Sequence, residues 1–123
     1  MASQLLDPSA ALARLDWDHL HFYVGNAKQA AHYYATGFGF HIAAYAGPET
    51  GVPGRASYLL EQDQLRFVLT SSLVANGPIA DHVRAHGGGV RAVALRLPGA
   101  RAAFAAAVAA GAQALEEPRG IED

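Results

Sequence analysis

Two hydrophobic patterns follow each other within residues 15–40. Apolar side chains occupy every second position of residues 20–24, at Leu20, Phe22 and Val24. A two-residue period is typical of a β-strand that buries one face. Residues 27–36 are mostly good helix formers. This stretch therefore predicts a strand, a tight turn and a helix.

The boundaries of this helix are marked by residues that cap helices well. Asn26 can accept a hydrogen bond from a free amide of the first turn. Gly37 offers a left-handed conformation in which the helix can stop. A second strand is expected over residues 38–45, with apolar side chains at Phe38, Phe40 and Ile42.

The next segments predict a loop, a hairpin and a short helix. Residues 46–55 are rich in Gly and Pro, which is typical of a loop. Residues 56–61 and 65–70 have the composition of strands, and the three polar residues between them predict a hairpin. A short helix is expected from Pro78 to His86, ended by glycines 87–89.

The opening pattern returns after an offset of 73 residues. When Leu20 is set against Val93, a strand again precedes a helix by one tight turn. The second helix is expected over residues 100–110, and a second strand over 112–117. The repeat indicates two related units, of which the second is shorter than the first.

The predicted fold class is α+β, with a βαβββ unit and an incomplete second βαβ(ββ) unit in a mixed, curved sheet. We expect an N-terminal arm at 1–14, a first unit at 15–74, a connecting short helix at 75–88 and a truncated second unit at 89–123. An open half-sheet would leave backbone groups unpaired. We therefore expect either the N-terminal segment of a longer protein or a chain whose missing strands come from a partner.

Composition narrows the function classes. The net charge of the 123 residues is −2 and the nine Lys and Arg residues are scattered, so nucleic acid is not an expected partner. The chain has no cysteine, which excludes disulfides and thiolate chemistry. No apolar run approaches the roughly 20 residues that span a bilayer, and no signal peptide is evident. We expect a cytoplasmic protein without a membrane partner.

Several segments resemble the N-terminal domain of the 4-hydroxyphenylpyruvate dioxygenase family, within the vicinal oxygen chelate superfamily. In chain order they are FYVGNAKQAAHYY at 22–34, GFGF at 37–40, AYAGPETG at 44–51, LRFVLTSSL at 65–73, DHVRAHGGGVRAVAL at 81–95 and EEP at 116–118. The resemblance implies an Fe(II) dioxygenase of tyrosine breakdown that converts 4-hydroxyphenylpyruvate and O2 to homogentisate and CO2. It also implies that the iron is bound by a separate C-terminal catalytic domain.

The resemblance implies no catalytic, cofactor-binding or metal-binding residue in this segment. In metal-binding relatives a histidine stands five residues before the valine that ends the first strand, which here is His19. The carboxylate position falls on Val68, and the repeat partner of His19 is Ala92, neither of which can ligate a metal. His19 is therefore only the alternative metal ligand, and we expect it to be satisfied by Asp16 or Asp18.

Other candidate groups have simpler explanations. His82 and His86 are four residues apart, a spacing that suits zinc, but a solvated helix face explains them better because no third ligand is evident. His21 and His32 show no ligand spacing. Adjacent Glu116 and Glu117 would point to opposite faces of a strand and could not act as an acid and base pair.

The resemblance implies the first of three functions that we consider, and the sequence patterns leave two others open. The leading one is a structural and oligomerising N-terminal segment of a 4-hydroxyphenylpyruvate dioxygenase-like enzyme, partnered by its C-terminal domain or by a second subunit; 4-hydroxymandelate synthase has the same architecture. A second is a stand-alone, resistance-type binding protein whose dimer places the loop at 46–55 at the mouth of a concave sheet. A third is a glyoxalase-like isomerase that uses His19 as a metal ligand.

Overall fold

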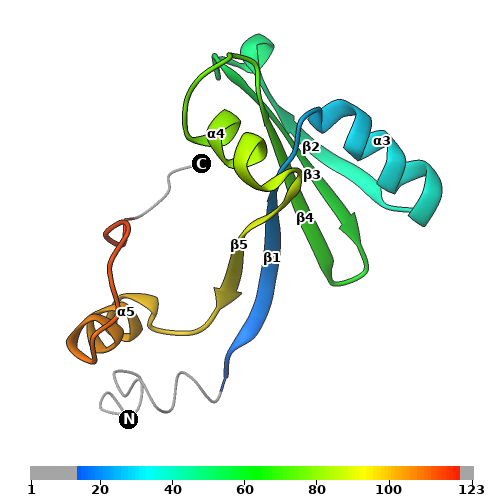
Figure 1. The fold of residues 1–123 in the computed structure, drawn as a ribbon. Coiled ribbons are helices and arrows are strands. Elements are labelled where there is room, and N and C mark those ends of the chain that lie inside the picture. The colour runs from blue at the N-terminus through cyan, green and yellow to red at the C-terminus, as the bar shows by residue number, and fades with distance from the viewer. Residues whose placement is uncertain (1–13, 120–123) are drawn as a thin grey trace. The chain divides into compact units, whose positions relative to one another are not determined.

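A computed structural model describes residues 14–119 of the chain. The arm expected at 1–14 therefore lies outside the described residues, except for Arg14. The secondary-structure elements, drawn in Figure 1, are β1 Asp16–Tyr23, α3 Ala27–Phe38, β2 His41–Ala46, the 3-10 helix η1 Pro48–Thr50, β3 Arg55–Gln62, β4 Leu65–Ser72, α4 Pro78–His86, β5 Gly89–Arg96 and α5 Ala100–Ala109. No helix among the described residues is both long and apolar enough to cross a membrane.

The five strands form one mixed sheet in the order β2-β3-β4-β1-β5. Strand β3 is antiparallel to both β2 and β4, whereas β1 runs parallel to β4. Helix α3 connects β1 to β2, and β3 and β4 follow, so that these elements form a βαβββ unit. The predicted α+β fold class, with a βαβββ unit followed by the beginning of a second unit, is confirmed.

The core lies between α3 and one face of the sheet (Figure 1). Because side chains alternate between faces along a strand, Phe22, Leu60 and Leu69 share this face. Leu60 and Leu69 are fully buried, and small alanines on α3 let the helix approach them closely. The buried apolar residues among positions 14–119 are few: Ala27, Ala31, Phe40, Leu60 and Leu69.

Helix α3 is capped at its N-terminus from two directions. The side chain of Asn26 accepts a hydrogen bond of 3.0 Å from the amide of Gln29, as the sequence predicts. The amide of Ala27 donates a second hydrogen bond, of 3.1 Å, to the buried hydroxyl of Ser71 on β4. These acceptors satisfy backbone donors that have no partner within a helix.

The predicted end of this helix at Gly37 is wrong by two residues. The helix continues through Phe38, and Gly39 takes the left-handed conformation with φ of 78°. Either glycine could provide the stop, but stopping at Gly39 directs Phe40 into the core, where its ring stacks on Phe67 at 4.7 Å. Strand β2 consequently begins at His41, and Phe38 is 55% exposed on the helix.

The hairpin between β3 and β4 is confirmed although its turn contains no glycine. Gln62 pairs with Leu65 across the two intervening residues. Asp63, the first of these, has a φ of 52°. Aspartate tolerates this left-handed conformation better than most side chains, which explains why the turn forms without glycine.

The 73-residue repeat is present in the secondary structure. Strand β5 begins 73 residues after β1, and α5 begins 73 residues after α3, at Ala100 instead of Ala27. The caps differ, because Gly99 precedes α5 in a left-handed conformation and offers no side-chain hydrogen bond. The two copies therefore share their element boundaries without sharing the residues that start the helix.

The strand expected over residues 112–117 is wrong. This segment is irregular in the structure, and the Leu115 side chain is 88% exposed. A strand is stabilised by pairing with a neighbour and by packing of one face, and none of the described strands pairs with this segment.

The described residues divide into two compact units. One is Asp18–Ala94, and the other combines the residues on either side of it. Within the second unit, the guanidinium of Arg96 lies 3.4 Å from the carboxylate of Asp16. All residues of the candidate site described below belong to the unit Asp18–Ala94.

Candidate functional site: the polar face of the sheet

The sheet face opposite α3 carries most of the polar side chains of the central strands. We call it the polar face. Directly paired residues of neighbouring strands point to the same face, so the register defines its members. They are His19, His21 and Tyr23 on β1, Arg66, Val68, Thr70 and Ser72 on β4, and Arg55, Ser57, Leu59 and Glu61 on β3.

Three of these residues form a hydrogen-bonded chain across β1, β4 and β3. The His21 Nε2 atom lies 2.9 Å from the Thr70 hydroxyl, which lies 2.7 Å from the Ser57 hydroxyl. Thr70 is only 2% exposed, so its hydroxyl depends on these two partners. The chain fixes the imidazole of His21 at the centre of the polar face.

His21 has a lowered pKa. Burial is the first cause, because removal of water destabilises the charged imidazolium more than the neutral imidazole. The positive charge of Arg91 is the next cause, followed by His19 and Arg55. The surroundings of His21 are therefore electropositive, and its neutral form is favoured.

One end of the polar face is covered by α4. The ring of His82 packs edge-on against Tyr23 at 5.3 Å, and the guanidinium of Arg91 lies 5.4 Å from the centre of the same Tyr23 ring. Such an arrangement places a cation over the negative face of the aromatic ring. Tyr23 thus links α4 and β5 to the polar face.

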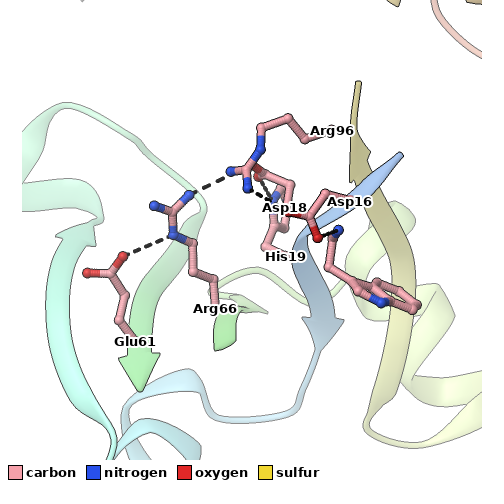
Figure 2. A network of polar contacts seen from close by, with 7 residues as sticks. Asp16, Asp18, His19, Glu61, Arg66 and Arg96 are labelled. Carbon is pink, nitrogen blue, oxygen red and sulfur yellow. Dashed lines mark hydrogen bonds and ion pairs between the residues drawn. The ribbon is translucent and has the colours of Figure 1, made fainter. Parts of the chain in front are cut away.

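The other end carries a row of ion pairs (Figure 2). The guanidinium of Arg66 lies 3.1 Å from the carboxylate of Glu61 and 3.7 Å from that of Asp18. Asp18 also accepts a 2.7 Å hydrogen bond from the Nδ1 atom of His19. The expectation that Asp18 satisfies His19 agrees with this contact.

The residues around His19 do not fit a divalent metal site. Arg66 immediately precedes Phe67, the partner of Leu20, and therefore brings a positive charge close to His19. Val68, at the carboxylate position of metal-binding relatives, pairs with His21 and offers no ligand atom. No group of three or more His, Cys, Asp or Glu side chains among the described residues is arranged to hold a metal ion.

His82 and His86 differ in their surroundings. Their rings lie 4.9 Å apart on α4, as expected for a spacing of four residues. His86 is exposed, but His82 is half-buried and its Nδ1 atom is buried without a hydrogen-bond partner among the described residues. The solvated helix face expected for both histidines is therefore wrong for His82, because Tyr23 packs against it.

An open pocket of about 470 Å³ adjoins the polar face. Residues 51–55 of the Gly/Pro-rich loop form one wall, and the end of β4 and the start of α4 form the others. Arg55 lines both this pocket and the polar face. Part of the loop at 46–55 thus borders an open pocket beside the polar face.

Sequence reasoning missed His21, Ser57 and Thr70. The alternation of His19, His21 and Tyr23 with apolar residues does place the two histidines on one face. Thr70, the hydroxyl partner of His21, lies 49 residues further along the chain, and Ser57 in turn bonds to Thr70. Only the strand register shows which serines and threonines lie beside His21.

Residues 17–121 match the family described as the Glyoxalase/Bleomycin resistance protein/Dioxygenase superfamily. The chain belongs to this superfamily. It is 42% identical over 108 residues to 4-hydroxyphenylpyruvate dioxygenase of Dictyostelium discoideum and 40% identical over 111 residues to that of Yarrowia lipolytica. Each match covers 87% of the chain but only 29% and 28% of the relative, in its N-terminal portion. The resemblance to the N-terminal part of these dioxygenases is confirmed.

Solved structures of superfamily members have the same fold. A variant of 4-hydroxymandelate synthase from Streptomyces coelicolor superimposes with a TM-score of 0.80 at 33% identity, covering 84% of this chain and 32% of that one. The Mycobacterium tuberculosis methylmalonyl-CoA epimerase has a TM-score of 0.65 at 20% identity, covering 77% and 63%. The second likeness is one of fold alone.

Proposed function

We propose that this chain serves as the N-terminal, non-catalytic part of a 4-hydroxyphenylpyruvate dioxygenase-like enzyme. The observation that carries the proposal is the identity of about 40% to the N-terminal portion of these enzymes, over 87% of the chain. The full enzyme would convert 4-hydroxyphenylpyruvate and O2 to homogentisate and CO2, in the breakdown of tyrosine.

In this proposal the iron is held outside the described residues, in a C-terminal domain. The surroundings of His19 support this, because Arg66 and Asp18 already occupy the space beside the imidazole with an ion pair. When bound to its own domain, Fe(II) supplies the activation of O2. The residues described here would stabilise the sheet and provide contacts to the catalytic domain or to a second subunit.

The proposal also includes the organisation of the chain and its setting. The segment at 15–74 would be a complete βαβββ unit, joined by residues 75–88 to a second unit that starts at residue 89. The equal spacing of β1 to α3 and of β5 to α5 supports this division. A cytoplasmic, homo-oligomeric enzyme is the setting that we propose.

A chimaera tests this function directly. The chain would replace the aligned N-terminal portion of the Dictyostelium discoideum dioxygenase, with the rest of that enzyme unchanged. We expect the purified chimaera to form homogentisate from 4-hydroxyphenylpyruvate and to contain about one iron per subunit. A chimaera that is folded, by circular dichroism and a cooperative unfolding transition, and binds iron but forms no product would contradict the proposal.

The 123-residue chain provides the complementary measurement. We expect it to retain less than about one-tenth of an equivalent of iron after equilibrium dialysis and to consume no O2 with 4-hydroxyphenylpyruvate. The His19→Ala variant should give the same iron content. Stoichiometric iron that disappears in His19→Ala would instead establish the glyoxalase-like alternative.

A second candidate reaction is that of 4-hydroxymandelate synthase. The 33% identity and TM-score of 0.80 to the Streptomyces coelicolor enzyme favour it, since this likeness also covers most of the chain. Placing the chain at the N-terminus of each enzyme and comparing turnover numbers separates the two. A chain derived from a dioxygenase should support the dioxygenase chimaera better.

A further inference from the structure

Two arginines of the unit Asp18–Ala94 have no carboxylate partner among the described residues. Arg66 pairs with Glu61 and Asp18, and Arg84 pairs with Asp81 at 3.0 Å. No ion pair of this kind joins Arg55 or Arg91 to a described carboxylate, and both side chains are exposed. The positive charges of this unit are therefore balanced unevenly over its surface.

The two arginines lie on either side of the hydrogen-bonded chain of the polar face. Arg55 stands two residues before Ser57 on β3, and both side chains point to this face. Arg91 lies over Tyr23, which pairs with Thr70. Burial lowers the pKa of His21 first, and the positive charges of Arg91 and Arg55 lower it further, which agrees with their place on the same face.

An apolar pair borders this electropositive region. Leu59 and Val68 are direct partners on β3 and β4, and both are half-buried on the polar face. Val68 is also the partner of His21. On the far side of this apolar pair lie Glu61 and Arg66, whose opposite charges form an ion pair.

We infer that the polar face binds a small organic carboxylate, with its carboxylate held between Arg55, Arg91 and His21 and its apolar body against Leu59 and Val68. Guanidinium groups recognise carboxylates through charge-assisted hydrogen bonds. The imidazole can donate from the nitrogen that does not face Thr70, and the two aliphatic side chains offer contact area to a ring or alkyl group. This binding site is independent of the dioxygenase reaction proposed above.

Benzoate is a suitable probe, because it combines a carboxylate with a flat apolar body. NMR titration of the 15N-labelled, 123-residue chain should show saturable shifts at His21, Leu59, Val68 and Thr70, with a Kd of about 1 mM or tighter. Assignment of the His21 ring by the His21→Gln variant allows its pKa to be followed. The pKa should rise when benzoate binds, since a bound anion stabilises the imidazolium.

Matched variants and ligands decide between charge recognition and surface adsorption. The double variant Arg55→Gln/Arg91→Gln should weaken benzoate binding about tenfold, whereas Arg84→Gln on α4 should leave it unchanged. Arg55→Lys and Arg91→Lys keep the positive charge, so they should weaken benzoate binding less than the glutamine variants. Benzamide tests the carboxylate, and acetate and inorganic phosphate test the need for an apolar body.

The inference would be overturned by any of four results. Benzamide could bind as tightly as benzoate, or Arg84→Gln could weaken binding as much as the double variant. The third result is the absence of saturable shifts on the polar face at benzoate concentrations of about 10 mM. Equal binding of inorganic phosphate would overturn the assignment to an organic carboxylate.

Discussion

The hydroxyl of Thr70 lies 2.9 Å from the Nε2 atom of His21, although the two residues are 49 positions apart in the sequence. The parallel pairing of β1 with β4 creates this contact, because it sets Tyr23 beside Thr70 and His21 beside Val68. Burial, followed by the nearby charges of Arg91, His19 and Arg55, lowers the pKa of the imidazole held in this contact.

Stability should fall on mild acidification because of His21. Its pKa in the folded chain lies below the ordinary value of 6.5. The unfolded chain therefore binds more protons as the pH falls below about 6.5, and the free energy of unfolding decreases until the folded-state pKa is passed. Urea unfolding at a series of pH values from neutral to acid should show this loss.

Two variants isolate the contribution of His21. His21→Gln removes the titration and keeps a group that can bond to Thr70, so its stability should depend less on pH in this window. His32→Gln, at an exposed position of α3, should keep the pH dependence of the original chain. Equal pH dependence in all three proteins would show that His21 does not cause the effect.

The N-terminal cap of α3 should contribute measurably to stability. Asn26→Ala removes the acceptor of the Gln29 amide and should lower the free energy of unfolding by about 1 kcal/mol. Asn26→Asp retains an acceptor and should lose much less. Urea unfolding measures both, and an Asn26→Ala protein as stable as the original would contradict the assigned role of the cap.

Local sequence information is sufficient to predict the Asn26 cap of α3 but not the second cap, which Ser71 provides. Asn26 directly precedes a run of helix formers, so the residue and its role can both be predicted. Ser71 caps the amide of Ala27 from 44 residues away, and no local pattern marks it. The same limit explains the end of the helix, because the choice of Gly39 over Gly37 depends on where Phe40 meets Phe67.

Gly47 should be intolerant of a side chain. A Cβ atom built at this position would collide with the phenol of Tyr45, which packs against Tyr58 with ring centres 4.8 Å apart. Interaction with the Glu49 carboxylate also raises the pKa of Tyr45 to about 12. Gly47→Ala should therefore cost about 1–3 kcal/mol in urea unfolding.

The cause can be separated from general effects of replacing glycine. Gly25→Ala adds a methyl group that meets no atom within 4 Å and should cost less. In a Tyr45→Ala background the collision disappears, so Gly47→Ala should then be almost neutral. If the stability losses of Gly47→Ala and Tyr45→Ala are additive in the double variant, the Tyr45 phenol does not cause the loss seen in Gly47→Ala.

The polar face was only partly predictable. Alternation along β1 places His19, His21 and Tyr23 on one side, and the comparison of His19 with Val68 and Ala92 predicts that this histidine has no ligand set around it. The neighbours of these side chains depend on register. A shift of one residue between β1 and β4 would replace Val68 and Thr70 by core-facing residues, so the ion pairs and the hydrogen-bonded chain follow from tertiary structure.

The small size of the buried core makes each of its large side chains important. Leu69 is fully buried between α3 and the sheet, and Leu69→Ala should lower the free energy of unfolding by about 2–5 kcal/mol because it leaves a cavity. Leu115 is 88% exposed in the irregular segment that was expected to be a strand, so Leu115→Ala should change stability by less than about 0.5 kcal/mol. Urea unfolding of both variants measures the difference. A large loss in Leu115→Ala would mean that the segment at 112–117 packs against a surface in solution, as the predicted strand would.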